Sequence, residues 1–162
     1  LWGYQLWINL PAAKKMIEPR YQDLDANAIP TETDKKCKVK IIAGNWNGCN
    51  GVCNTVWPVD LLDVELVKGA QFKHSIPDGY NLALFVYEGR FSTNGQSISM
   101  GQIGIFSREG DLCLEAGEDG ASFLILAGKP IGEPVARMGP FVMNNRTELI
   151  QAAEDYRQGL LN

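Results

Sequence analysis

The sequence contains a single histidine, His74, among 162 residues. Because mononuclear metal enzymes commonly hold their ion through several imidazoles, this scarcity excludes such a site built from this chain alone. Long hydrophobic runs are also lacking. None approaches the roughly 18–20 apolar residues that cross a bilayer as a helix, so we expect no membrane partner. An excess of positive charge is absent too, since 15 Lys and Arg oppose 19 Asp and Glu. A net charge of −4 argues against direct nucleic-acid binding.

The beginning of the chain lacks the marks of a secretory signal peptide. Residues 1–7 have no basic flank and no small-residue cleavage site, and the first residue is not Met. We therefore expect either a processed product or a piece of a longer protein. Without a secretion signal, the four cysteines are interpreted as reduced thiols of an intracellular protein, cytoplasmic or, in a eukaryote, nuclear.

Short apolar runs, separated by turn residues, are what the sequence does contain. Its length and its 45% apolar and 21% charged residues fit one globular domain over residues 1–162. Runs rich in Val, Ile, Leu and Phe alternate with Gly, Pro, Asn and Asp, a pattern typical of an all-β sandwich or barrel. Strands are predicted at 4–10, 39–43, 62–66, 82–87, 102–106, 112–114 and 122–127. The mostly apolar run at 82–87 is expected to be buried on both faces.

Turns are predicted between these strands wherever Gly follows an acidic residue or Asn. They lie at 77–79, 88–89, 94–95, 109–111 and 118–120. Residues 44–54 combine three Gly with four Asn, residue types that tolerate positive φ, and are predicted to form a loop.

Two stretches depart from the strand pattern. Residues 11–34 contain Pro19, Pro30 and many polar side chains, and are predicted to be an extended surface segment with one helical turn near 14–18. Near the end, apolar residues recur at helical spacing, and Asn145 with Glu148 resembles a capping box. An amphipathic helix at 145–160 is therefore predicted to pack on the outside of the β core, with partner binding as its alternative role.

His74 is the candidate catalytic residue, because it alone titrates near neutral pH. It precedes the turn at 77–79, where a histidine more often makes one structural hydrogen bond. Ser75 beside it does not complete a nucleophilic pair, because adjacent strand residues point to opposite faces.

Cys37, Cys49 and Cys53 are the candidate metal ligands, with Cys113 or His74 as a fourth ligand of a tetrahedral zinc site. Three residues separate Cys49 from Cys53, one more than in a zinc ribbon, and no second close pair exists. A disulfide such as Cys49–Cys53 and unpaired thiols without a role are the alternatives, and the spacing favours the unpaired thiols.

Aromatic side chains either line a ligand cavity or fill the interior of a small barrel. Phe85, Tyr87 and Phe106 are the ligand-binding candidates for an aromatic molecule, and Trp46, Trp57, Phe72 and Tyr80 are further members of this group. Lys36, Lys38 and Lys40 alternate along the start of a strand, which indicates a solvated face or a patch for an acidic partner.

Several segments of the chain resemble the second half of the pirin family. The most specific are Gln-Leu-Trp-Ile-Asn-Leu-Pro at 5–11 and Gly-Pro-Phe-Val-Met-Asn at 139–144, supported by residues 15–22 and 126–134. The resemblance runs from about residue 3 to residue 158 and is weakest over 44–56.

This resemblance implies one jelly-roll barrel of a bicupin, a protein with two such barrels side by side. In the family the first half binds a single iron through three histidines and a glutamate, and the second half binds no metal. Iron is therefore expected only in the absent N-terminal half, and no cofactor in this chain. The positions that hold metal ligands in cupins correspond here to His74, to Leu82 and Ala83, and to residues 112–114. His74 is the one imidazole among them, so the family's metal site is not expected in this chain.

The family's roles, transcription co-regulation and quercetin dioxygenation, belong to the iron half. The resemblance thus implies a structural and partner-binding module. Its partner would be another cupin domain, either the N-terminal half or a second copy, with other proteins as further partners. An exposed apolar face would make the isolated half self-associate. The alternatives are a cupin enzyme or a small-molecule-binding cupin that takes an aromatic, flavonol-like ligand, with His74 or a cysteine thiolate acting.

Overall fold

The computed structural model describes residues 3–107 and 110–161. The chain forms two compact units, which are described separately. Unit 1 comprises Leu1–Tyr21 and Ile131–Asn162, and unit 2 comprises Gln22–Pro130.

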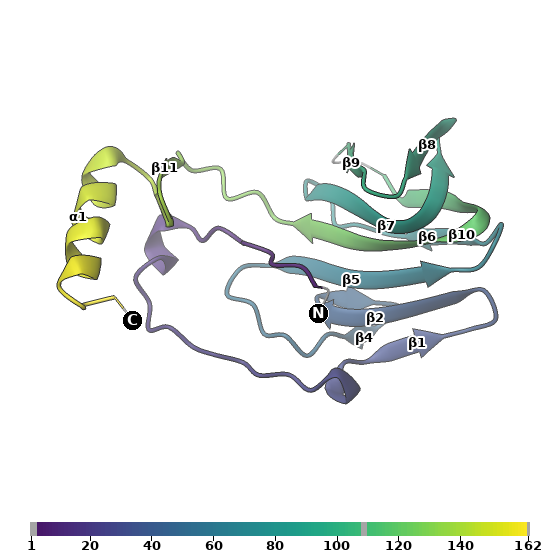
Figure 1. Cartoon of the computed structure of the whole chain (residues 1–162), viewed down its shortest axis with the longest axis horizontal. Helices are drawn as coiled ribbons and strands as arrows, with labels where there is room; N and C mark the ends of the chain where they lie inside the picture. The colour runs from purple at the N-terminus through teal and green to yellow at the C-terminus, as the bar shows by residue number, and fades with distance from the viewer. Residues whose placement is uncertain (1–2, 108–109, 162) are drawn as a thin grey trace. The chain divides into compact units, whose positions relative to one another are not determined.

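Unit 2 is an antiparallel β structure, as predicted for the fold class (Figure 1). Its sheet has the order β1-β2-β5-β10-β7-β8, with β6 also paired to β10 and β9 to β7. Because this order is an open path, unit 2 is a jelly-roll sandwich rather than a closed barrel. The elements are η2 (Ala26–Ala28), β1 (Thr31–Thr33), β2 (Cys37–Ala43), β3 (Asn45–Trp46), β4 (Cys49–Asn50), β5 (Val59–Leu66), β6 (Gln71–His74), β7 (Asn81–Thr93), β8 (Gln96–Ser99), β9 (Ile103–Phe106) and β10 (Leu112–Gly128).

The interior of unit 2 is built by alternation along these strands. Every second residue of β2, β5, β7 and β10 points inward, where the fully enclosed side chains are Val39, Ile41, Leu62, Val64, Leu84, Val86, Phe91, Phe123 and Ile125. Burying each such side chain contributes about 1.5–3 kcal/mol. The expectation that 82–87 is buried on both faces is wrong, because the intervening residues of β7 are half-buried.

Strands β7 and β10 are long and bend in the middle. The first part of β10 pairs with β6 and its second part with β5, while β7 pairs with both parts. The turns predicted at 88–89 and 118–120 are wrong, because both segments lie inside these strands where the register shifts. Gly89 and Gly120 have φ of 65° and 78° there. The glycines that led us to predict turns are therefore the residues at which the strands bend.

The segment 44–54 is not wholly a loop. β3 and β4 form a short hairpin in which Asn45 pairs with Asn50 and Trp46 with Cys49. Asn47 and Gly48 make the turn with positive φ, as their residue types allow. The turn predicted at 94–95 is confirmed, since it joins β7 to β8. The predicted turn at 109–111 lies partly outside the described residues.

Unit 1 contains the 3-10 helix η1 (Ala12–Lys14), the hairpin of β11 (Ala136–Met138) and β12 (Phe141–Met143), and helix α1 (Arg146–Arg157). The predicted capping is confirmed: Asn145 Oδ1 accepts from the Glu148 N–H at 3.0 Å, and the Glu148 carboxylate accepts from the Asn144 N–H at 2.8 Å. Helix α1 packs on the β11–β12 hairpin, with Tyr156 edge-on to Phe141. It ends before the predicted residue 160, because Gly159 adopts φ of 72°.

The strand predicted at 4–10 is wrong. These residues have no regular secondary structure, and no strand of the described chain pairs with them. The helical turn expected near 14–18 begins earlier, directly after Pro11. No helix within the described ranges has the length and apolar character that a membrane span requires.

Candidate functional site

His74 ends β6 with its side chain turned into unit 2. Phe72 and His74 are buried while their neighbours Gln71 and Lys73 are exposed, so the imidazole lies on the inner face. The residue is 8% exposed, and its Nε2 atom is buried without a hydrogen-bond partner among the described residues. Burial lowers the pKa of His74, and the carboxylates of Asp60 and Asp111 oppose this effect. The imidazole is therefore neutral at physiological pH.

Asp60 approaches the same interior from the start of β5. It shares the inner face with Leu62 and Val64, and its carboxylate accepts from the Asn45 N–H at 3.4 Å. Burial raises the pKa of Asp60, while the Asn45 hydrogen bond and His74 lower it. Gly44 makes this approach possible, because a Cβ there would lie 1.8 Å from Asp60 Oδ1.

Trp46 brings a second buried nitrogen without a partner. Its ring stacks on Phe72 with a centroid distance of 6.3 Å and an interplanar angle of 3°. The Phe72 ring is in turn 6.4 Å from the His74 ring. The indole Nε1 is buried, and the described residues offer it no acceptor.

Trp46, Asp60, His74 and Tyr80 are called the interior polar cluster below. Tyr80 is half-buried and packs against the core, and burial together with the Asp60 charge raises the pKa of its phenol. The sequence singled out His74, and named Trp46 and Tyr80 among the aromatics. Asp60 was missed, although its alternation with Leu62 and Val64 would have placed it on the inner face.

The donor set of the interior polar cluster does not fit an iron of the kind that the family resemblance implies for a cupin. An indole nitrogen is a hydrogen-bond donor rather than a metal ligand, and His74 is the single imidazole. Across the described part of the chain, no three His, Cys, Asp or Glu side chains lie together as metal ligands. We therefore derive no chemistry through iron.

The three aromatic candidates do not line one cavity. Phe85 and Tyr87 lie on the face of β7 opposite the enclosed Leu84 and Val86, whereas Phe106 packs against the core. The Tyr87 hydroxyl donates to Asp63 at 2.6 Å, and Lys40 donates to the other oxygen of that carboxylate at 3.0 Å. Burial, the hydrogen bond to Asp63 and the charges of Asp63 and Glu65 raise the pKa of Tyr87 well above its usual range. Tyr87 is thus a structural phenol outside the interior.

The cysteines are unpaired thiols, the alternative that their spacing favoured, and the described residues do not bring the candidate zinc ligands together. Cys37, Cys49 and Cys53 are half-buried, Cys113 is exposed, and all four are free. Burial, reinforced by Asp34, raises the pKa of Cys37 to about 11. A thiol that is protonated at neutral pH is a poor nucleophile.

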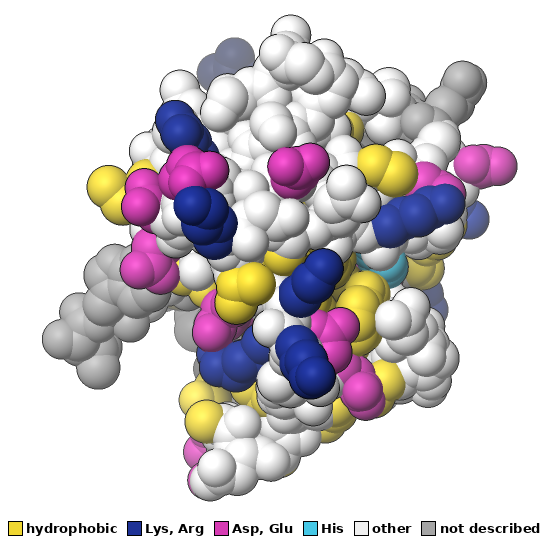
Figure 2. Space-filling model, turned by 90° about the vertical axis from the view of Figure 1, so that its right-hand side faces the viewer, with side chains coloured by type: hydrophobic (Ala, Val, Ile, Leu, Met, Phe, Trp, Pro, Cys, Tyr) yellow, Lys and Arg dark blue, Asp and Glu magenta, His cyan; other side chains and the backbone are white. Residues whose placement is uncertain are grey.

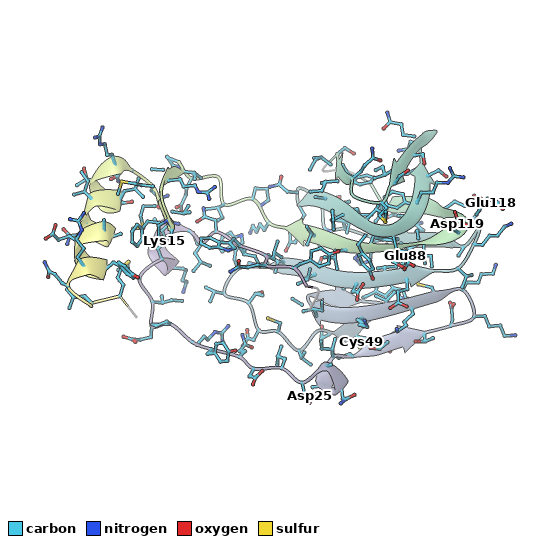
Figure 3. The ribbon with its side chains drawn as sticks, viewed as in Figure 1. Lys15, Asp25, Cys49, Glu88, Glu118 and Asp119 are labelled. Atoms are coloured by element: carbon cyan, nitrogen blue, oxygen red, sulfur yellow. The ribbon has the colours of Figure 1, made fainter. Side chains whose placement is uncertain are left out.

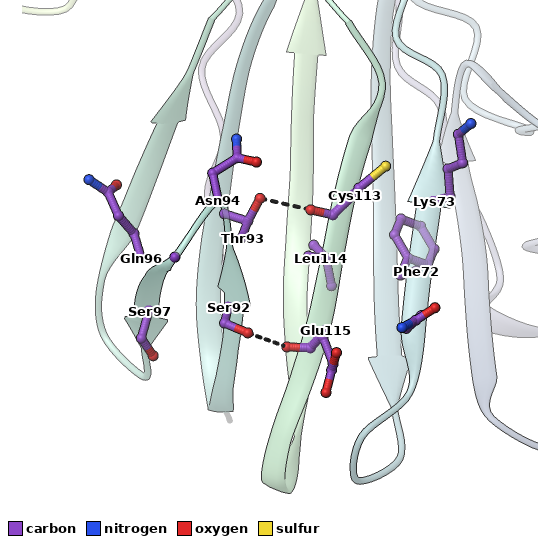
Figure 4. A pocket seen from close by; sticks show the side chains of 12 residues that line it. Phe72, Lys73, Ser92, Thr93, Asn94, Gln96, Ser97, Cys113, Leu114 and Glu115 are labelled. Carbon is purple, nitrogen blue, oxygen red and sulfur yellow. Dashed lines mark hydrogen bonds between the residues drawn. The ribbon is translucent and has the colours of Figure 1, made fainter.

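A surface pocket of about 610 Å³ lies between β6, the first part of β10 and the β7–β8 hairpin (Figure 4). The hydroxyl of Thr93 donates to the Cys113 carbonyl at 2.7 Å, and that of Ser92 to the Glu115 carbonyl at 3.5 Å. Lys73 at its edge pairs with Asp111 at 2.8 Å. The two hydroxyls and the ammonium are therefore engaged by neighbouring parts of the sheet.

Of the three alternating lysines, Lys36, Lys38 and Lys40, the last two are paired with neighbouring carboxylates. Lys38 pairs with Glu65 at 2.9 Å and Lys40 with Asp63 at 3.0 Å. Figure 2, which shows the right-hand side of Figure 1, has positive and negative side chains interspersed rather than separated. This arrangement is that of a solvated, ion-paired face.

Exposed large hydrophobic side chains gather instead in unit 1. Among the residues that the structure describes, sixteen large hydrophobic side chains are exposed, and twelve of them belong to unit 1. We call these twelve the apolar surface of unit 1: Tyr4, Leu6, Trp7, Ile8, Met16, Ile17, Tyr21, Val135, Met138, Ile150, Tyr156 and Leu160. Trp7, Met16 and Tyr156 are each more than 60% exposed. This concentration occurs in the smaller unit of the chain.

The fold defines a cupin domain. A crystal structure of quercetin 2,3-dioxygenase from Acinetobacter baumannii superposes on 94% of this chain with a TM-score of 0.89 and 34% identity. The Pirin C-terminal cupin domain model matches residues 61–162, and the chain belongs to the pirin family. It is 37% identical to Pirin-1 of Arabidopsis thaliana over 96% of its length, and 39% identical to a pirin-like protein of Caulobacter vibrioides over 97%.

The chain spans little more than half of these relatives. It covers 56% of the Arabidopsis protein, 58% of the Caulobacter protein and 54% of the Acinetobacter structure. The fold and family expectations are thereby confirmed, whereas the activity of the longer proteins is a property of chains about twice this size.

Proposed function

We propose that this chain is the metal-free half of a two-cupin protein, and that the apolar surface of unit 1 docks onto the second cupin domain. The observation that carries this proposal is the concentration of exposed large apolar side chains in one unit. Exposed apolar patches of unusual extent mark protein interaction sites. The relatives, which extend well beyond the matched region, supply sequence for such a second domain.

Burial of apolar surface favours the association of unit 1 with the second domain. A large apolar side chain that passes from full exposure to burial contributes about 1.5–3 kcal/mol. Covering the apolar surface of unit 1 therefore contributes a free energy of the same order as the cost of association, which is about 4–15 kcal/mol. The four free thiols support an intracellular setting for this assembly.

The test is co-expression of this chain with the tagged, unmatched portion of the Caulobacter relative. We expect the chain to be captured with the tag in equal amounts and without iron in its own half. The double variant Trp7→Ser/Met16→Ser should reduce capture at least tenfold. Val67→Ser/Met100→Ser, which removes two comparably exposed side chains of unit 2, is the matched control. Absence of capture, or equal loss in both variants, would contradict the proposal.

A second candidate function is binding of a small aromatic molecule at the interior polar cluster. It is favoured by two buried nitrogens without partners, Trp46 Nε1 and His74 Nε2, beside the Phe72 ring. Quercetin, the molecule in the name of the Acinetobacter neighbour, is a suitable probe. Titration followed by the NMR signals of the Trp46 and His74 side chains should show saturable shifts. Signals unchanged at the solubility limit of quercetin would remove this candidate.

A further inference from the structure

Unit 1 contains a pocket of about 460 Å³ within its apolar surface. One side is formed by the irregular segment 7–10 with Lys15 and Met16, and the other by the β11–β12 hairpin, with Ala152 of α1 and Leu161 also in the lining. Most of the lining is apolar, and the two charged side chains in it, Lys15 and Arg137, are both positive.

Lys15 is held at this pocket by neutral oxygens. Its Nζ atom donates to Asn9 Oδ1 at 2.6 Å and to the Val142 carbonyl at 2.9 Å. The side chain follows η1 and is half-buried (Figure 3). Hydrogen bonds to neutral groups fix the ammonium in place but leave its charge without a counterion, an arrangement that favours an incoming anion.

Arg137 adds a second positive charge from the other side. It lies in β11 opposite Val142 of β12 and is exposed. Its guanidinium has no ion pair within residues 3–107 and 110–161. A guanidinium is the group best suited to bind a carboxylate in two parallel hydrogen bonds.

The acidic side chains near this hairpin are already occupied. Glu133 accepts from the Ala12 N–H at 2.7 Å and from the Asn144 side-chain amide at 2.8 Å. Glu148 accepts from the Asn144 N–H as part of the helix cap. Neither lines the pocket, so the residues that the structure describes there supply two cations on apolar walls and no acidic side chain.

We propose that this pocket receives an acidic side chain, flanked by apolar side chains, from the second cupin domain. The inference rests on the proposed function and specifies the chemistry of the partner at one point of the docking surface. The incoming carboxylate pairs with Arg137 in the field of the fixed Lys15 ammonium, while Trp7 and Met16 pack on its apolar neighbours. Charge complementarity distinguishes this contact from the rest of the apolar surface, which recognises shape and area alone.

The first test uses the capture experiment with single charge variants. Arg137→Gln should weaken capture of this chain about tenfold, because it removes the pairing cation. Arg157→Gln removes the same charge from the end of α1, outside the pocket, and should change capture less than twofold. Equal effects of the two variants on a chain that is still captured would overturn this inference and leave the proposed function standing. If the unaltered chain is not captured, the proposed function fails and the inference with it.

The second test addresses the pocket on this chain alone. Octanoate and octanol carry the same apolar tail and differ in the carboxylate, so their binding can be compared through the NMR signals of the Trp7 indole and the Met16 methyl group. Octanoate should bind about tenfold more tightly than octanol, and Arg137→Gln should reduce the difference, leaving only the contribution of Lys15. Equal affinity for the two probes would show that the cations do not select an anion and would overturn the inference.

Discussion

The ionisable side chains in the interior of unit 2 favour their uncharged forms. His74 is buried and Asp60 half-buried, and desolvation is the largest influence on the pKa of each. For His74 desolvation lowers the pKa, so the folded chain resists protonation of the imidazole. For Asp60 desolvation raises the pKa, so the carboxylate of Asp60 binds a proton more readily in the folded chain than in the unfolded chain.

These two directions give opposite pH dependences. The pKa of His74 is below 6.5 in the fold, so the unfolded chain binds more protons as the pH falls below 6.5. Stability should therefore decrease from pH 7 downwards through this window. Asp60 acts in the opposite direction nearer its own ordinary pKa of 3.8, where uptake of a proton favours the fold. His74 therefore dominates the weakly acidic range.

Urea unfolding of the full chain at a series of pH values between 7 and about 5 measures this effect. His74→Phe keeps an aromatic ring at the position and removes the titration, so its stability should change less over the same range. Stability of the unaltered chain that is flat or rises on acidification, or the same slope in His74→Phe, would contradict the assignment.

At the scale of elements, the bend shared by β7 and β10 organises unit 2. It lets β10 pair with β6 before the bend and with β5 after it, which folds one sheet over the common core. The sequence located both bend points through their Gly residues but assigned them to turns. A glycine with positive φ can either end a strand in a turn or bend the strand. Which of the two occurs depends on whether a partner strand continues to pair beyond the glycine.

Gly120 should be more sensitive to substitution than its φ of 78° alone explains. A Cβ there would lie 2.5 Å from the Leu66 carbonyl oxygen, a backbone atom that cannot move without disturbing β5. Gly48 has a similar φ of 83° and open space around it. We expect Gly48→Ala to cost about 1 kcal/mol and Gly120→Ala about 3 kcal/mol in urea unfolding, since the second adds a steric clash to the backbone strain. Equal costs would show that the close approach to Leu66 does not constrain the bend.

At the scale of the whole molecule, the sequence predicted the β interior well because alternation reports burial directly. Leu62, Val64 and Leu66 were placed on one face of a strand, and all three are buried. The same reasoning failed at 4–10, where apolar residues alternate yet Tyr4, Leu6 and Ile8 are each more than 40% exposed. Alternating apolar residues predict a face that packs against other apolar side chains. The pattern does not show whether those side chains belong to the same chain or to another one. Of the interior polar cluster, the sequence named His74, Trp46 and Tyr80, and alternation along β5 would have placed Asp60 on the same inner face. That these four side chains lie together follows from tertiary packing, which the sequence did not predict.

The uncovered residues of unit 1 make the chain alone prone to self-association. Its sedimentation coefficient should rise with concentration. When no other partner is present, only a second copy of the chain can bury the apolar surface of unit 1. Trp7→Ser/Met16→Ser should weaken the association at least tenfold, because a tenfold change needs about 1.4 kcal/mol and each large side chain supplies about that much or more when buried. Val67→Ser/Met100→Ser controls for the general loss of exposed apolar groups and should associate like the unaltered chain. Sedimentation as a monomer at all concentrations would mean that unit 1 satisfies its apolar side chains without a partner, and the docking role would then lose its physical basis.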